Sequence, residues 1–412
     1  MALSPNGSPA LMRAINAARI VRKLREAGPM SRANLVRGTG LSKPTVTNVV
    51  AYLESLDYIS LARESTPNED GRTAQAPQYE YRASRGQVLG IDIGADKTLL
   101  VLADLAGRVL GSTRFPTRST APLGPPQIFE ELGKAAAKLQ AEVGTSNATL
   151  LLVVVGTPGV VSRDGIVSMA PQLEGWEGLN LVSSLDEVFP CPVVVESEVS
   201  LSLQAERWLG VARGVDDALF VHLGIGIGAG ILVDGQIHRG ADGGAGEIGL
   251  IPFPRQTDDG KLELVPLEFL AGGGALQERG ASLANTPDGA RLLAIAGGDS
   301  TAVDASTVFG AMRNGDPSAT SLVREMASIL AWGISCLVCA LNPRAIVIGG
   351  GLSRSADLFL TQLQEEVATS VPFNPEWFVS KLGDEAVALG AVNQACAIVE
   401  RDLFGPFTTK EL

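Results

Sequence analysis

Apolar residues recur at two different spacings along this chain, and the change of spacing divides it into a short first part and a long second part. Over residues 9–26 they recur every three or four positions, which is the spacing of an amphipathic helix. From Gln87 onward, short apolar runs alternate with helical stretches, as is typical of an α/β fold. We therefore predict a small helical region followed by a larger α/β body.

Two more short helices are predicted after the first one. Ser31 has the side chain of a helix N-cap, and the helix that follows it is expected to stop at Gly40. Ser42 caps the third helix, and Pro44 lies in its first turn, where a missing N–H costs little. The buried positions predicted for the third helix are Val46, Val49, Val50, Leu53 and Leu56.

A tight glycine-containing turn between the second and third helices predicts a helix-turn-helix, whose third helix would enter the major groove. Strands expected at 58–62 and 78–82 flank a polar turn at 64–75, which would form a wing with Gly71-Arg72 at its tip. A guanidinium there suits a narrow minor groove. The alternative is a generic helical hairpin with solvated basic side chains. The residues predicted to contact DNA are Arg32, Ser42, Lys43, Pro44, Thr45, Thr47, Asn48 and Arg72.

The body contains one local pattern twice. A strand over 88–93 ends in a glycine turn, and strands over 98–103 and 109–115 follow. A second strand, 217–223, runs into a glycine turn over 224–230 and a strand at 231–233. Glycine turns after apolar strands can bring backbone N–H groups close to phosphate. The repeat predicts two related α/β halves with a cleft between them.

The domain boundaries follow from these patterns. We predict a DNA-binding domain at 1–85, a first lobe at 86–200 and a second lobe at 201–385 for effector binding and oligomerisation. A closing helix near 386–402 is expected to return to the first lobe. The other predicted elements are helices at 126–143, at 319–341 and up to about 209, and strands at 150–155, 193–196 and 345–348.

The charge is distributed unevenly between the two parts. The 412-residue chain has a formal net charge of −12, yet residues 1–85 hold 12 Lys/Arg against 7 Asp/Glu. A small basic region on an acidic body suits a DNA reader joined to a domain with another task. No apolar run reaches the roughly 18 residues of a membrane span and no signal peptide is recognised, so a cytoplasmic protein is expected.

Four cysteines in a chain of this length do not form a disulfide framework. Cys336 and Cys339 form a C-x-x-C within an apolar helical run. Two core thiols are the interpretation we favour over a redox or metal site. His222 and His238 fall on a strand and after a hairpin, where structural roles are expected.

Four markers together resemble the ROK family (repressors, open reading frames and kinases), in its regulator branch. The resemblance covers nearly the whole chain. It implies an N-terminal winged helix-turn-helix followed by a two-lobed, actin-like (ribonuclease-H-like) body of the sugar-kinase type. The markers are Leu41-Ser42-Lys43-Pro44-Thr45-Val46, the paired glycine turns, Gly244-Ala245-Gly246-Glu247-Ile248-Gly249, and Ile346-Val347-Ile348-Gly349-Gly350-Gly351-Leu352-Ser353.

The nucleotide motifs depart from the kinases of that family. At the first phosphate turn the second Gly is Ala95 and the Thr is Asp96, although Asp92, Gly94 and Lys97 are retained. A carboxylate about 4 Å from a phosphate oxygen is repelled by several kcal/mol. At the second turn Ile225 stands where a Thr hydroxyl is usual.

The catalytic and zinc motifs depart from the family as well. Its general base falls on Glu198 rather than Asp, and the neighbouring Asn is Ser197. A displacement of about a bond length can cost roughly 10²-fold in rate. Leu250 replaces a zinc-binding His, and residues 251–275 contain no cysteine, so no tetrahedral zinc site is expected.

These departures predict a regulator, most simply a repressor of carbohydrate genes, whose body has lost kinase chemistry and needs no cofactor or metal. A homodimer or homotetramer on a double-stranded operator is expected. The effector would be a sugar or sugar derivative. An active carbohydrate kinase with a DNA-binding head and an architectural scaffold without effector are the alternatives. The predicted effector residues are Pro158, Gly159, Gln172, Ser197, Glu198 and Glu247.

Overall fold

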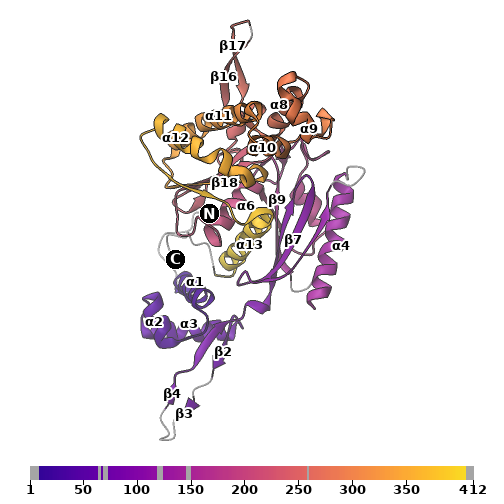
Figure 1. Cartoon of the computed structure of the whole chain (residues 1–412). Helices are drawn as coiled ribbons and strands as arrows, with labels where there is room; N and C mark the ends of the chain where they lie inside the picture. The colour runs from indigo at the N-terminus through magenta and orange to yellow at the C-terminus, as the bar shows by residue number, and fades with distance from the viewer. Residues whose placement is uncertain are drawn as a thin grey trace. The chain divides into compact units, whose positions relative to one another are not determined.

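The computed structural model describes residues 9–63, 66–67, 73–117, 124–144, 150–257 and 259–404. The chain forms two compact units (Figure 1). Unit 1 comprises Met1–Val155, Val182–Val194 and Ala391–Leu412, and unit 2 comprises Gly156–Leu181 and Val195–Gly390. The three-domain division at 85, 200 and 385 stays a prediction.

Three helices of unit 1 form the head, by which we mean residues 9–82. They are α1 (Pro9–Ala27), α2 (Arg32–Thr39) and α3 (Lys43–Ser55), and they begin and end close to the predicted positions. Ser31 caps α2 by accepting from the N–H of Asn34, and Gly40 ends it with φ 70°. A three-stranded sheet completes the head, in the order β1 (Met30–Ser31), β5 (Gln78–Tyr81) and β2 (Ile59–Arg63).

Two details of the head differ from the prediction. Leu56 is exposed rather than buried, because α3 ends at Ser55 and Leu56 follows as its C-cap. The turn predicted at 64–75 contains two short paired strands, β3 (Thr66–Pro67) and β4 (Thr73–Gln75). Arg72 lies outside the described residues.

Two five-stranded sheets have the same order of strands, which confirms the internal repeat. In each, the first three strands in chain order lie side by side, and the fourth and fifth lie on the other side of the first. The first sheet contains β6 (Gln87–Ile93), β7 (Lys97–Asp104), β8 (Val109–Pro116), β9 (Leu150–Thr157) and β12 (Val193–Ser197). The second contains β13 (Ala218–Leu223), β14 (Ile227–Val233), β15 (Gln236–Ile237), β18 (Ala345–Gly349) and β19 (Glu376–Val379).

The second glycine turn is shorter than predicted. The turn spans only Gly224–Gly226, because Gly228 and Gly230 belong to β14. A Cβ on Gly230 would lie 2.6 Å from the carbonyl oxygen of Val199 in α6 (Glu198–Trp208). These glycines therefore allow the helix to lie against the strand.

Helices complete both units (Figure 1). The helix α13 (Ala386–Phe404) begins in unit 2 and has most of its length in unit 1. Within unit 1 an ion pair joins it to the head, with Arg25 Nη1 2.9 Å from Glu400 Oε2. The main helices outside the head are α4 (Pro125–Val143), α5 (Leu181–Asp186), α6 (Glu198–Trp208), α7 (Glu268–Ala271), α8 (Gly273–Ala284), α9 (Ala290–Ile295), α10 (Ala305–Arg313), α11 (Pro317–Leu341), α12 (Leu360–Ser370) and α13 (Ala386–Phe404).

The longest helix, α11, is the core helix of unit 2. By length and composition it is apolar enough to cross a membrane, but 61% of its most apolar 18-residue stretch is buried inside the protein. Its buried stripe includes Ile334 and Val338, whereas Cys336 and Cys339 are exposed. The prediction of two core thiols was therefore wrong, because both cysteines face away from the buried stripe.

A hairpin that the sequence analysis did not predict follows the Gly244–Gly249 marker. It consists of β16 (Pro252–Gln256) and β17 (Leu262–Pro266), which pair antiparallel. It occupies the stretch where the family resemblance places a zinc-binding cluster. No group of three or more His, Cys, Asp or Glu side chains that could hold a metal ion occurs among the described residues.

Candidate functional site

The strand-to-helix turn at Ser197 lies at the centre of the candidate site in unit 2. β12 ends at Ser197, whose side chain caps α6 by accepting from the N–H of Ser200. The Ser197 hydroxyl also donates to Ser200 Oγ at 3.0 Å. Glu198 is the first residue of α6, where the helix dipole favours a carboxylate. The Ser197 hydroxyl therefore accepts one hydrogen bond and donates another within the protein, and both fix the position of its side chain.

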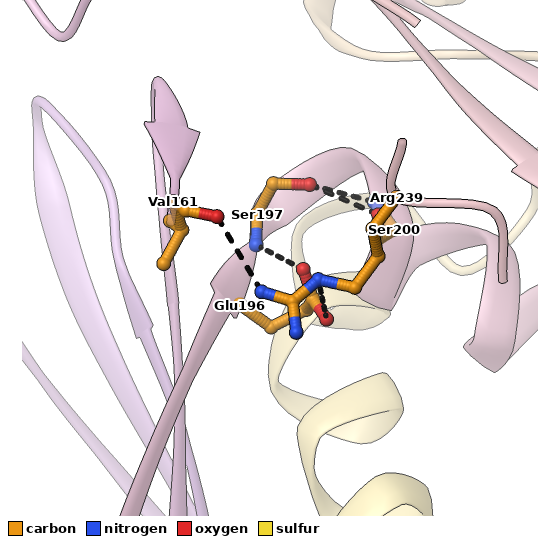
Figure 2. A network of polar contacts seen from close by, with 5 residues as sticks. All are labelled: Val161, Glu196, Ser197, Ser200 and Arg239. Atoms are coloured by element: carbon orange, nitrogen blue, oxygen red, sulfur yellow. Dashed lines mark hydrogen bonds and ion pairs between the residues drawn. The ribbon is translucent and has the colours of Figure 1, made fainter. Parts of the chain in front are cut away.

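An ion pair between the buried side chain of Glu196 and the partly exposed side chain of Arg239 holds this turn in place (Figure 2). The side chain of Glu196 is 4% exposed, and its Oε1 accepts from the N–H of Ser197 at 2.9 Å. Its Oε2 lies 3.3 Å from Nε of Arg239. The same guanidinium donates to the carbonyl oxygen of Val161 at 3.4 Å. Arg239 thus joins β12 to the short strand β10 (Val160–Val161), which follows Pro158-Gly159.

Pro158 and Gly159 form a tight connection after β9. Gly159 has φ 88°, and a Cβ there would lie 2.4 Å from the carbonyl oxygen of Ser168. The residue before Pro158 is fixed as well, because Thr157 Oγ1 accepts from the indole N–H of Trp176 at 2.9 Å. Gln172, in the same segment, lies near Gly226 of the second glycine turn.

Three carboxylates from different elements of unit 2 lie close enough to interact electrostatically. Burial raises the pKa of Glu247 above its ordinary value, and the nearby charges of Glu268 and Glu198 raise it further. Glu268, the first residue of α7, also lies beside Gly226 and Gly249. Sequence analysis missed Glu268, because a single Glu after a Pro-Leu pair carries no recognisable motif. Carboxylates at this density can accept hydrogen bonds from ligand hydroxyl groups.

The raised pKa of Glu247 has a measurable consequence. The folded state keeps the proton at pH values where the unfolded chain has lost it, so stability falls as pH rises from about 4.5 through the raised pKa. We expect Glu247→Gln to raise the Tm at pH 7, with the difference from the wild type closing towards pH 4. Thermal unfolding across this range measures it. Glu187→Gln, at an exposed position, is the control. Equal shifts for both variants, or a gap independent of pH, would contradict the effect.

Backbone hydrogen bonds are made at both glycine turns. In unit 1, the N–H of Gly94 donates to the carbonyl oxygen of Lys97 at 3.1 Å, and the Asp96 side chain is exposed beside it. In unit 2, the N–H groups of Gly273 and Gly274, at the start of α8, donate to the carbonyl oxygens of Gly224 and Ile225. Those two amides are therefore already occupied.

The head places most of the predicted DNA-contacting residues at the start of α3. Ser42, Lys43, Pro44, Thr47 and Asn48 are exposed, and Thr45 is half-buried. The Thr47 hydroxyl donates to the carbonyl oxygen of its neighbour Lys43 at 3.0 Å.

Arg32 is placed differently from the other predicted contacts. Its guanidinium carbon lies 5.0 Å from the centre of the Tyr79 ring, and Nη2 is 3.9 Å from Glu54 Oε2. Arg32 therefore links α2 to β5 and α3 within the head.

Comparisons with known proteins identify the family. Residues 88–397 match the ROK family. A xylose repressor of Caldicellulosiruptor bescii is 27% identical over 400 residues, which cover 94% of this chain and 96% of the repressor. A glucokinase of Halalkalibacterium halodurans is 29% identical over 318 residues, covering 73% of this chain and 92% of the glucokinase.

A solved structure shows the same fold. It is described as a ROK family transcriptional regulator, a homologue of the E. coli MLC protein, and superposes with a TM-score of 0.74 at 21% identity, covering 96% of this chain and 97% of that one. The body is an α/β fold of the type found in ROK repressors and ROK sugar kinases. The family match spans well over half of the sequence and confirms the resemblance inferred from its four markers. The chain belongs to the ROK family.

Proposed function

We propose that this chain is a DNA-binding transcriptional regulator, a repressor of carbohydrate-related genes. The observation that carries the proposal is the head: three helices and a small sheet, with a capped α3 that exposes Lys43, Thr47 and Asn48 at its N-terminal end. The coverage of the relatives supports it. The xylose repressor matches 94% of this chain, whereas the glucokinase matches 73%.

The head acts as a winged helix-turn-helix in this proposal. α3 enters the major groove, where hydroxyl, amide and ammonium groups suit phosphates and base edges. Two heads read two half-sites of a palindromic operator, which requires a homodimer or a homotetramer in the cytoplasm. The residues assigned to the interface are Arg32, Ser42, Lys43, Pro44, Thr45, Thr47, Asn48 and Arg72.

Unit 2 acts as the sensor of a sugar or sugar derivative. The support is the gathering of Glu198, Glu247 and Glu268, whose carboxylates suit ligand hydroxyl groups. Effector binding would shift the population of body conformations and so the spacing of two heads. The residues assigned to the effector are Pro158, Gly159, Gln172, Ser197, Glu198 and Glu247.

The DNA-binding part can be tested without knowing the operator. Selection from a randomised double-stranded DNA library should enrich a palindromic sequence. Lys43→Ala should then weaken binding to the selected DNA about tenfold and reduce the salt slope by about 1. Lys138→Ala, at an exposed position on α4, is the control. Failure to enrich any sequence, or equal effects of the two variants, would overturn the proposal.

The body is proposed to be catalytically inactive, with Ala95, Asp96 and Ile225 in its phosphate turns. The second candidate function, a carbohydrate kinase with an added head, has support from the glucokinase relative and the carboxylate of Glu198. Measuring ATP turnover with hexoses and amino sugars separates the two. Turnover that is lost in Glu198→Ala would establish the kinase.

Thermal-shift screening with the same sugars tests the sensor, because a ligand that binds the native state raises the Tm.

A further inference from the structure

The hairpin of β16 and β17 presents one face composed almost wholly of apolar residues. Its register pairs Pro252 with Pro266, Pro254 with Leu264, and Gln256 with Leu262. Side chains of directly paired residues lie on the same face, and residues two apart share it. We call this set of six residues the apolar face. Within it, the side chain of Leu262 is 73% exposed and that of Leu264 is 64% exposed.

The opposite face of the hairpin already has its partners. Phe253 packs edge-on against Trp332 of α11, with ring centres 5.5 Å apart, and Val265 is its cross-strand neighbour. The next pair on this face, Arg255 and Glu263, forms an ion pair at 2.9 Å. The hairpin is therefore anchored to unit 2 by one face, and the apolar face is turned away from that anchor.

Within the described residues the hairpin pairs with no other strand, and its two outer edges differ in the hydrogen bonds that they can make. The N–H of Leu267 donates to the carbonyl oxygen of Ile251, and the N–H of Thr257 donates to that of Lys261. Hydrogen-bonded and non-hydrogen-bonded pairs alternate along an antiparallel ladder. The hydrogen-bonded pairs of the hairpin are therefore those that contain residues 251, 253, 255 and 257. The N–H and C=O groups of the alternate residues point outward. On β16 two of those residues are Pro252 and Pro254, which have no N–H. On β17 they are Leu262 and Leu264, which can both donate and accept.

The exposure and the charge of this surface indicate which kind of partner could bind it. Among the large apolar side chains of the described residues, Leu262, Leu264 and Phe269 are the three most exposed, and they fall within eight consecutive positions. The apolar face carries no charge, so a charged partner surface would be desolvated without compensation. A two-fold axis instead sets the same uncharged face and the same free edge against each other.

We propose that the apolar face and the outer edge of β17 form an interface with a second copy of this chain. Two β17 strands pair antiparallel across a two-fold axis, and their leucines and prolines cover one another. The biological role of this interface rests on the proposed function, because the interface is the surface that would bring two heads onto one operator. The contact itself depends only on the hairpin.

Sedimentation of the full chain tests the interface. We expect the wild type to be at least a dimer and the double variant Leu262→Asp/Leu264→Asp to be monomeric at micromolar concentrations. Ile295→Asp, which places the same charge at another exposed apolar position of unit 2, should sediment like the wild type. A monomeric wild type, or a double variant that keeps the oligomer, would overturn the proposal.

A second variant tests the strand edge separately from the apolar contact. Leu264→Pro removes an outward N–H and leaves the bonds within the hairpin intact. It should weaken self-association at least tenfold, and unchanged association would contradict edge pairing. DNA selection keeps the two proposals distinguishable. If the double variant is monomeric but the dimeric wild type selects no DNA, the interface stands and the regulator proposal fails. If the oligomer persists in the variant while the wild type selects DNA, the interface alone fails.

Discussion

Replacing Gly246 with alanine is expected to destabilise unit 2 by about 4 kcal/mol or more, the largest effect of any single substitution proposed for this chain. Gly246 has φ 96°, a conformation that disfavours a side chain. A Cβ there would also lie 1.8 Å from the carbonyl oxygen of Ala229. Neither segment can retreat easily, because the N–H of Ala229 donates to the carbonyl oxygen of Gly246 at 2.8 Å. Urea unfolding measures the loss.

Gly297→Ala is the matched control. Gly297 also has positive φ, 70°, but a Cβ there would have no neighbour within 4 Å. It should cost only the backbone strain, about 1–2 kcal/mol. If the two variants unfold at the same urea concentration, the close approach of Gly246 to β14 is not real. Because Glu247 follows directly, the glycine also sets the position of one of the three carboxylates.

Replacing Arg239 with methionine should destabilise unit 2 by about 3 kcal/mol, because it leaves the buried carboxylate of Glu196 without its counter-ion. The side chain of Glu196 is 4% exposed and that of Arg239 32% exposed. The carbonyl oxygen of Val161 would lose a donor at the same time. Urea unfolding at pH 7 measures the cost.

The exposed pair of Arg313 and Asp357 provides the comparison. Both of its side chains are about half exposed, so Arg313→Met should cost less than about 1 kcal/mol. In the double variant Glu196→Gln/Arg239→Met no buried charge remains, and much of the lost stability should return. Equal costs for the buried and exposed pairs would show that the contact drawn in Figure 2 does not hold the turn at Ser197.

Local signals accounted for much of the fold. Ser31, Gly40 and Ser42 marked helix boundaries correctly, because caps satisfy backbone groups that every helix end leaves free. The repeated strand–glycine–strand pattern predicted two related halves, and the two sheets share one strand order. The chemistry of these signals lies within a few residues, so the sequence alone reveals it.

Tertiary contacts explain what the sequence did not reveal. Gly228 and Gly230 looked like part of a turn, because their need for glycine comes from α6, which lies elsewhere in the sequence. Cys336 and Cys339 looked buried, because an apolar run does not show which side of a helix is covered. The site showed the same limit: Ser197 and Glu198 were found by motif, while Glu268 and Arg239 act through contacts from distant elements. The assignment of the site residues to DNA and effector stays a prediction.

The helix α13 sets an order on the synthesis of this protein. Unit 1 includes residues up to Val155 and residues from Ala391 onward, so its first sheet leaves the ribosome long before the helix that belongs with it. At about 5–20 residues per second, the delay is on the order of tens of seconds. Throughout that interval the contacts that α13 makes with the rest of unit 1, such as the ion pair of Arg25 and Glu400, cannot form. Unit 1 is therefore completed only after residues 391–404 have been synthesised, well after all of its strands.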